Sequence, residues 1–355
     1  MRGDLDLSGR AFTHWPVLPI PDGEVRRVAI ERAELTYVPR EVARFSGLET
    51  LRLDHNRLAA LPAFLFRLTQ LRHVSLYDNW LVSAPSGLAR LGGLEDISLG
   101  KNRLREFPNA VLQLTGLRRL NLAENDIAAI PEEIGRLGAL SMLDLGHNRI
   151  RELPVALGTL VALEDALYLS DNLLDSIPEP VFRGMSRLRY LNLTHNPLGA
   201  LPDTIGDLSA LEELRLYANE LSALPDSVTR LSALRELHAQ DNRLEVLPED
   251  IGALVRLREL TLSNNRIERL PASIGQLTTL ARLDLRNNPL EALPEEIGAL
   301  ASLTHLDLRG ARLSRLPDSL GALPLLEKLD LRWVHLSTPP TWLRAVRERG
   351  CRVLI

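Results

Sequence analysis

Residues 48–70 read LETLRLDHNRLAALPAFLFRLTQ and residues 71–93 read LRHVSLYDNWLVSAPSGLARLGG, so the two stretches align at their apolar positions. The same 23-residue unit recurs from residue 25 to the end of the chain, and a degraded copy precedes it. A fixed period of this length is typical of an array of stacked repeats. The clear copies begin at Leu48, Leu71, Leu94, Leu117, Leu140, Leu163, Leu188, Leu211, Leu234, Leu257, Leu280, Leu303 and Leu326.

Each unit opens with an LxxLxL segment that predicts a short strand. The alternation puts Leu51 and Leu53 on one side of the strand and Arg52 and Asp54 on the other. The rest of the unit must carry the chain back to the next strand. Because one unit buries too little apolar surface to offset the entropy of ordering it, neighbouring units must share a core. The pattern predicts an α/β solenoid, a curved array with a concave parallel sheet and short helical or 3₁₀ turns on its convex side.

Asparagine and proline each form a column in the aligned repeats. Asparagine holds position 9, where the chain bends away from the strand and backbone groups lose their ladder partners. We therefore expect a hydrogen-bonded ladder of amides. Proline holds position 15, where its fixed φ suits the first residues of a helical or 3₁₀ turn. The asparagines are Asn56, Asn79, Asn102, Asn125, Asn148, Asn172, Asn196, Asn219, Asn242, Asn265 and Asn288.

The unbroken period predicts one domain over residues 1–355. We expect a degenerate N-terminal capping unit over 1–24, in which Leu5, Leu7, Phe12, Trp15 and Pro16 keep the spacing. Regular repeats should cover 25–325, and a C-terminal capping unit should cover 326–355. The unit from Leu163 has 25 residues, with one extra residue in LEDALYL and one in PVFRGMSRL. The first insertion is either a bulge that re-aims side chains or a harmless loop insertion.

Composition favours a cytoplasmic protein. The net charge is −4, which gives no overall field for nucleic acid or an anionic membrane. No apolar run approaches the roughly 18 residues of a membrane span. Cys351 is the only cysteine, whereas secreted arrays usually carry disulfide-bonded caps. Delivery into another cell as a secreted effector stays open. Among 42 basic residues only Lys101 and Lys328 are lysine, which suggests a high-GC, bacterial genome.

The unit LEELRLYANELSALPDSVTRLSA, residues 211–233, resembles the intracellular 23-residue class of leucine-rich repeat proteins. This class includes Ras-binding scaffolds, plant Ras-group-related proteins, Scribble-type scaffolds and many bacterial proteins. The resemblance implies a horseshoe whose concave face recognises another protein. Some bacterial relatives add a C-terminal ubiquitin-ligase domain, which we do not expect in this chain.

Signatures of catalysis or metal binding are not found in the sequence. It contains no GxxxxGK[ST], HExxH, CxxC or dinucleotide-binding pattern. The histidines are dispersed, and His195 and His238 lie two units apart, too far to ligate one ion together. Cys351 falls in the terminal CRVLI, which reads as a capping strand with a structural thiol. We therefore expect a non-enzymatic protein without cofactor or metal.

Aromatic residues at the variable strand positions suggest a binding site. Four of the five tyrosines lie there, and three of them belong to consecutive units that begin with the irregular one, where we expect them to align across neighbouring strands. Such residues give contact area at low entropic cost, although aromatics also suit exposed strands. The proposed protein-binding residues on the concave face are Tyr77, Met142, Tyr168, Tyr190, His195, Tyr217 and His238.

A second pattern lies toward the C-terminus. Aspartate holds position 5 in Asp284, Asp307 and Asp330, and arginine holds position 7 two residues later in each unit. The rows are expected to neutralise one another as a structural ladder, and a docking site around Asp307 and Arg309 is the other possibility.

These observations favour a monomeric scaffold or adaptor that binds a partner protein, without nucleic acid or membrane. The alternative is a regulatory or effector protein that modulates a signalling enzyme such as a small GTPase or a phosphatase.

Overall fold

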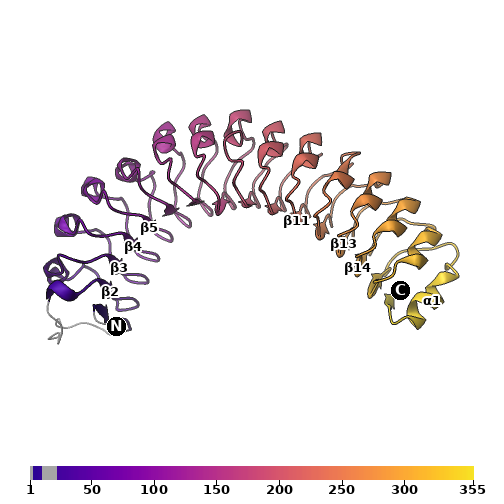
Figure 1. Cartoon of the computed structure of the whole chain (residues 1–355), viewed down its shortest axis with the longest axis horizontal. Helices are drawn as coiled ribbons and strands as arrows, with labels where there is room; N and C mark the ends of the chain where they lie inside the picture. The colour runs from indigo at the N-terminus through magenta and orange to yellow at the C-terminus, as the bar shows by residue number, and fades with distance from the viewer. Residues whose placement is uncertain (1–2, 10–21) are drawn as a thin grey trace. The chain divides into compact units, whose positions relative to one another are not determined.

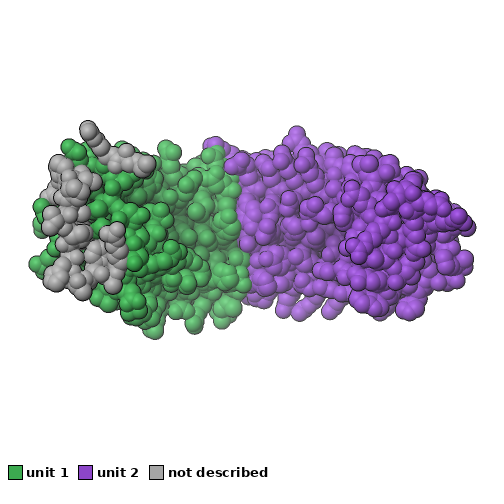
Figure 2. Space-filling view, turned by 90° about the horizontal axis from the view of Figure 1, so that it is seen from below, with its two compact units in different colours: residues 1–173 green, residues 174–355 purple. Residues whose placement is uncertain are grey.

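The computed structural model describes residues 3–9 and 22–355. The chain divides into two compact units, unit 1 with residues 1–173 and unit 2 with residues 174–355 (Figure 2). The boundary falls inside the irregular 25-residue repeat. Of the degraded first repeat, Phe12, Trp15 and Pro16 lie outside the described residues.

Within its described residues, unit 1 contains eight strands that pair in parallel and in sequence order. The strands are β1 (Asp4–Asp6), β2 (Arg27–Ala29), β3 (Thr50–Arg52), β4 (His73–Ser75), β5 (Asp96–Ser98), β6 (Arg119–Asn121), β7 (Met142–Asp144) and β8 (Ala166–Tyr168). Short 3₁₀ turns return the chain on the side away from the strands (Figure 1). These turns are η1 (Asp22–Glu24), η2 (Arg40–Arg44), η3 (Ala63–Arg67), η4 (Ser86–Arg90), η5 (Asn109–Gln113), η6 (Glu132–Arg136) and η7 (Val155–Thr159).

Unit 2 repeats this arrangement and ends in a short α-helix followed by a last strand. Its strands are β9 (Tyr190–Asn192), β10 (Glu213–Arg215), β11 (Glu236–His238), β12 (Glu259–Thr261), β13 (Arg282–Asp284), β14 (His305–Asp307), β15 (Lys328–Asp330) and β16 (Arg352–Leu354). Its helices are η8 (Glu179–Val181), η9 (Asp203–Asp207), η10 (Asp226–Arg230), η11 (Ile251–Ala253), η12 (Ala272–Gln276), η13 (Glu295–Ala299), η14 (Asp318–Ala322) and α1 (Trp342–Glu348). The strand β16 after Cys351 confirms the predicted capping strand, which pairs with β15.

The predicted alternation of side chains is confirmed in the strands. Leu51 and Leu53 are buried and Arg52 is exposed, as period-2 geometry requires. Asp54 differs from the simple expectation, because it is only 7% exposed. Its carboxylate accepts hydrogen bonds from Ser75 Oγ at 2.6 Å and from the Tyr77 backbone N–H at 2.8 Å, which compensates for its burial.

The asparagine column forms the predicted ladder. Asn148 Oδ1 accepts a bond from the Ile127 N–H at 3.0 Å. Its Nδ2 donates to the carbonyl oxygens of Leu122, Leu145 and Gly146 at 3.0–3.1 Å. One amide thus satisfies backbone groups of its own repeat and of the repeat before it. The residue ahead of the asparagine has φ near +55°, as in His147 at 52°, so the chain bends sharply at this point.

Proline precedes the returning turn, as predicted. Pro131 has φ −75° and ψ 153° and is directly followed by η6, whose first turn carries Glu132 and Glu133. The chain is thus extended at Pro131, and the turn begins at the next residue. The same arrangement recurs at Pro225 before η10 and at Pro294 before η13. Pro108 differs with ψ 80°, and Pro248 is separated from η11 by two residues.

The irregular repeat keeps its strand in register. Met142 pairs with Ala166, and Asp144 pairs with Tyr168, residue for residue. The extra residue, Asp165, is accommodated immediately before β8, where its N–H bonds to the Ser141 carbonyl at 2.9 Å. Its carboxylate also accepts the Ser141 hydroxyl at 2.8 Å. This favours the loop-insertion interpretation over a bulge that redirects the strand's side chains.

Candidate binding face

The exposed face of the sheet in unit 2 carries two rows of side chains, because the first and third residues of each strand point to the same side. We call these the first row and the third row. The first row, from β9 to β16, is Tyr190, Glu213, Glu236, Glu259, Arg282, His305, Lys328 and Arg352. The third row is Asn192, Arg215, His238, Thr261, Asp284, Asp307, Asp330 and Leu354.

The two rows have opposite charge patterns. The first row is acidic over β10–β12 and basic from β13 onward, whereas the third row changes in the opposite sense. Each charged residue therefore has an opposite charge available two residues along its strand or on a neighbouring strand. The sequence analysis identified the aspartates of the third row but not the opposite charge patterns of the two rows. Comparing positions 3 and 5 across the repeats would have revealed them.

Tyr190 lies in the first row beneath an arginine. The Arg215 guanidinium carbon lies 5.5 Å from the centre of the Tyr190 ring, within the range of a cation–π interaction. Arg215 Nε also donates a hydrogen bond to Glu213 Oε1. The three residues form a connected group in which the arginine is held by both a ring and a carboxylate.

Tyr217 occupies a different place from Tyr190. It follows β10 by two residues, whereas Tyr190 is the register partner of Glu213. The His195 and Tyr217 rings form a T-shaped contact, with centroids 5.3 Å apart and an interplanar angle of 87°. The prediction that the tyrosines align in one row is therefore wrong, because they stand at positions 3 and 7 of their repeats.

The remaining predicted aromatic positions belong to unit 1. Tyr168 is the last residue of β8, in register with Asp144, and Met142 is the first residue of β7, in register with Arg119. Tyr168 thus pairs with an aspartate, and Met142 pairs with an arginine on one side and with Ala166 on the other. No continuous aromatic row therefore runs along β7 and β8.

Tyr77 lies in a separate polar cluster of unit 1. Its hydroxyl donates to Glu124 Oε1 at 2.5 Å, and its ring forms a T-shaped contact with His55 at a centroid distance of 5.8 Å. The hydrogen bond to Glu124, with burial and the nearby negative charges, raises the pKa of Tyr77 to about 12. Asp78 joins the cluster by accepting from His55 Nδ1 at 2.8 Å and from Lys101 Nζ at 3.2 Å.

His238 contacts carboxylate and hydroxyl groups. Its Nδ1 lies 3.0 Å from Thr261 Oγ1 and its Nε2 lies 3.2 Å from Glu236 Oε2. The side chain is only 15% exposed. Each ring nitrogen thus has a polar neighbour within 3.2 Å.

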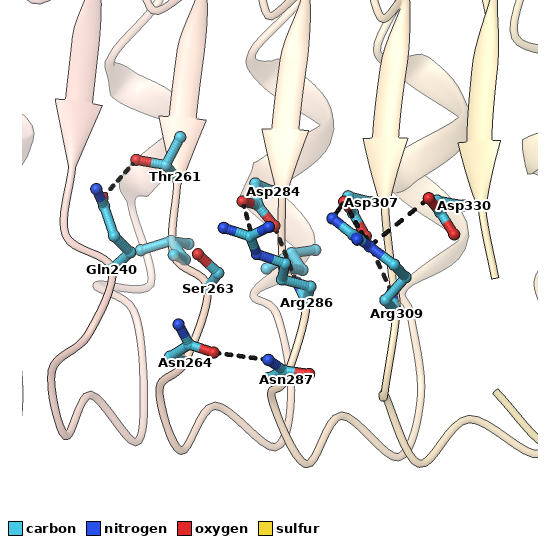
Figure 3. Close-up of polar contacts among 12 residues, drawn as sticks. Gln240, Thr261, Ser263, Asn264, Asp284, Arg286, Asn287, Asp307, Arg309 and Asp330 are labelled. Carbon is cyan, nitrogen blue, oxygen red and sulfur yellow. Dashed lines mark hydrogen bonds and ion pairs between the residues drawn. The ribbon is translucent and has the colours of Figure 1, made fainter. Parts of the chain in front are cut away.

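Asp307 and Arg309 form the best-bonded pair of the aspartate–arginine ladder (Figure 3). Arg309 Nε and Nη2 donate to the Asp307 carboxylate at 2.9–3.0 Å and 2.6 Å, and Arg309 Nε lies 3.6 Å from Asp330 Oδ2. The predicted neutralisation therefore occurs mainly within each repeat, between the last residue of the strand and the arginine that follows it, and Arg309 also approaches Asp330 of the next repeat. Since Nε and Nη2 are already bonded to Asp307, Arg309 offers a partner less than the sequence alone suggested.

Cys351 is buried in unit 2. Only 6% of it is exposed, and burial raises the pKa of its thiol, which disfavours the reactive thiolate. This arrangement agrees with a structural thiol.

No helix among the described residues combines the length and the hydropathy needed to cross a bilayer.

Parallel strands in sequence order, returning 3₁₀ turns and an asparagine ladder define a leucine-rich repeat solenoid. A family model for a leucine-rich repeat region matches residues 181–253 and 245–346, and a second leucine-rich repeat model matches residues 92–150. A solved leucine-rich repeat protein from Leptospira interrogans is 31% identical, with 99% of this chain and 90% of that chain covered and a TM-score of 0.91. The chain belongs to the leucine-rich repeat family.

Other solved structures share the fold. The plant peptide hormone receptor RGFR1, solved in complex with RGF2, is 27% identical with a TM-score of 0.70; the match covers 88% of this chain and 57% of the receptor chain. An internalin from Listeria monocytogenes is 19% identical with a TM-score of 0.74, and 86% of each chain is covered. No curated protein matches the chain significantly. The Ras-group and Scribble-like comparison stays a resemblance of sequence.

Proposed function

We propose that this protein is a non-enzymatic scaffold or adaptor that recognises a partner protein on the exposed sheet face of unit 2. The observation that carries the proposal is the pair of fixed aromatic contacts, Arg215 over Tyr190 at 5.5 Å and His195 against Tyr217 at 5.3 Å. Tyrosine and arginine are enriched among residues that dominate binding energy.

Pre-organisation makes these side chains suitable for binding. A ring held by a guanidinium or an imidazole loses less rotamer freedom when a partner covers it, so less of the contact energy is spent on ordering. The surrounding charges of the two rows offer alternating acceptors and donors for a polar rim. The solved complex of the plant receptor RGFR1 with RGF2 supports protein or peptide recognition by analogy.

The other features of the proposal follow from the sequence. We propose a monomer in the cytoplasm of a bacterium, without a nucleic-acid or membrane ligand. The net charge of −4 supports the lack of such a ligand, and the relative from Leptospira supports a bacterial source. Affinity capture followed by mass spectrometry would identify the partner. A captured GTPase or phosphatase whose turnover changes on binding would favour the regulatory alternative over a scaffold.

The test is calorimetry with the captured partner. Tyr190→Ala and Tyr217→Ala are expected to weaken binding at least about tenfold, since truncating a central aromatic typically costs about 2 kcal/mol or more. Glu295→Ala, in the turn η13 on the other side of the repeat, is the control and should leave affinity unchanged. All three variants should keep the wild-type Tm. Unchanged affinity in both tyrosine variants would exclude this face as the binding site.

A further inference from the structure

One group of side chains in unit 2 has the composition of a metal site. Among the residues that the structure describes, only Glu213, Glu236 and His238 form a set of three whose ligand atoms all lie within 4.8 Å of one another. Glu213 and Glu236 are register partners on β10 and β11, and His238 follows Glu236 by two residues on the same face. The sequence analysis missed this set because it required several histidines to converge with carboxylates, whereas this set contains one histidine.

The hydrogen bonds around His238 determine which of its nitrogens faces the carboxylates. Thr261 Oγ1 donates to Gln240 Oε1 at 2.8 Å (Figure 3). Its single proton is thereby used, so Thr261 Oγ1 accepts from His238 Nδ1, which lies 3.0 Å away. In neutral His238 the proton therefore sits on Nδ1, and Nε2 presents a lone pair to Glu236 Oε2 at 3.2 Å.

Two acceptors that face each other at this distance need a positive charge between them. A proton on Nε2 would satisfy Glu236 alone, whereas a divalent ion would bind Nε2 and also neutralise the neighbouring carboxylate of Glu213. We propose that Glu213, Glu236 and His238 bind a divalent transition-metal ion such as zinc on the exposed sheet face. This proposal stands independently of the protein partner proposed above.

The ligand chemistry supports zinc. One imidazole nitrogen and two carboxylate oxygens are typical ligands of this ion, and three protein ligands leave the fourth position of a tetrahedral site open. The bond from His238 Nδ1 to Thr261 is the outer hydrogen bond that a metal-binding histidine commonly makes, and Gln240 orients that hydroxyl in turn.

Arg215 competes with the metal for one ligand. Its Nε donates to Glu213 Oε1, and its guanidinium covers Tyr190. A carboxylate has a second oxygen, so Glu213 can bind an ion while it keeps the arginine, but the positive charge of Arg215 opposes the ion. Removing that charge is therefore expected to strengthen metal binding, whereas removing a ligand weakens it.

The experiment uses the full chain, freed of metal by a chelator, and zinc as the probe. Isothermal titration calorimetry should give one ion per chain. Glu236→Gln, which keeps the size of the side chain, and His238→Ala should each weaken binding at least about tenfold. Arg215→Gln should bind zinc more tightly than the wild type. His305→Ala is the matched control, because this first-row histidine bonds to Thr304 Oγ1 at 2.9 Å and lies outside the triad.

Two results would overturn the proposal. One is a wild-type chain that binds no zinc after equilibration with an excess of the ion. The other is wild-type affinity in both Glu236→Gln and His238→Ala. Circular dichroism and Tm establish that each variant is folded. Cobalt as a second probe adds a spectroscopic readout, since d–d absorption that depends on His238 and not on His305 reports nitrogen coordination at this site.

Discussion

The Arg332 guanidinium donates two hydrogen bonds to the Asp330 carboxylate, from Nε to Oδ1 at 2.9 Å and from Nη2 to Oδ2 at 2.8 Å. Asp330 has no exposed surface. Burial acts to raise the pKa of Asp330, but the hydrogen bonds from Arg332 and the charges of Arg332 and Arg309 outweigh burial and hold the pKa below its usual value. At the same repeat position, burial is the largest influence on Asp284 and raises its pKa, although the Arg286 guanidinium lies 3.5 Å from the carboxylate and acts in the opposite direction.

Arg332→Ala is expected to lower the Tm, and to do so in a pH-dependent way. Because the pKa of Asp330 is lower in the folded than in the unfolded chain, the pair contributes stability above the unfolded pKa and loses it as pH falls through the folded pKa. Thermal unfolding should therefore show a large difference from wild type at neutral pH and a small one in strong acid. Arg286→Ala, the control, should cost less at neutral pH. A difference that is equal at both pH values would indicate lost packing instead.

Asn148→Ala tests the asparagine ladder. The variant removes the oxygen that accepts from the Ile127 N–H and the nitrogen that donates to three buried carbonyl oxygens. We therefore expect a loss of about 1–3 kcal/mol in the free energy of unfolding. Urea unfolding measures it. Asn148→Asp keeps an acceptor for Ile127 but loses the donors, and it should destabilise at least as much as alanine. An unchanged urea midpoint in either variant would contradict the ladder at this position.

The fold was predictable because its determinants are local and repeated. Leu51 and Leu53 mark a strand by their spacing, and an asparagine at the same bend in successive repeats must meet the same backbone groups, as Asn148 does. Stacking then follows from the need to share a core.

The candidate site was predictable only in part. The sequence shows which residue types lie in or near each strand. Whether two side chains share a row depends on their exact positions in the repeat. Tyr190 stands at position 3 and Tyr217 at position 7, so they do not share one. The orientation of Arg215 over Tyr190 rather than toward His238 depends on rotamers that a repeat pattern does not specify. The same applies to the hydrogen bond that fixes the His238 tautomer.

Asp144→Asn is expected to stabilise the protein at neutral pH. Burial raises the pKa of Asp144, so its charged form is less favourable in the folded chain, although its Oδ1 accepts the Gly146 N–H at 3.0 Å. Asparagine keeps that acceptor without the charge. Asn121, at the same repeat position, accepts the Ala123 N–H at 2.9 Å in this way.

Urea unfolding at several pH values measures this gain. It should shrink as pH falls through the raised pKa, because wild-type Asp144 then becomes neutral in the folded state. The reciprocal variant Asn121→Asp should destabilise at neutral pH. A lower urea midpoint for Asp144→Asn would mean that the charge itself is favourable there.

The hydrogen bond from Tyr77 to Glu124 predicts a loss of stability in alkali. The pKa of Tyr77 rises from 10.0 to about 12, so between these pH values the unfolded chain loses this proton while the folded chain keeps it. Stability must therefore fall as pH rises through this window.

The phenolate absorbance of the wild type, minus that of Tyr77→Phe, isolates the Tyr77 titration from those of the other four tyrosines. Glu124→Gln keeps an acceptor but removes the charge, so Tyr77 should then ionise nearer to pH 10.0. An unaltered Tyr77 titration in Glu124→Gln would mean that Glu124 does not control this hydroxyl.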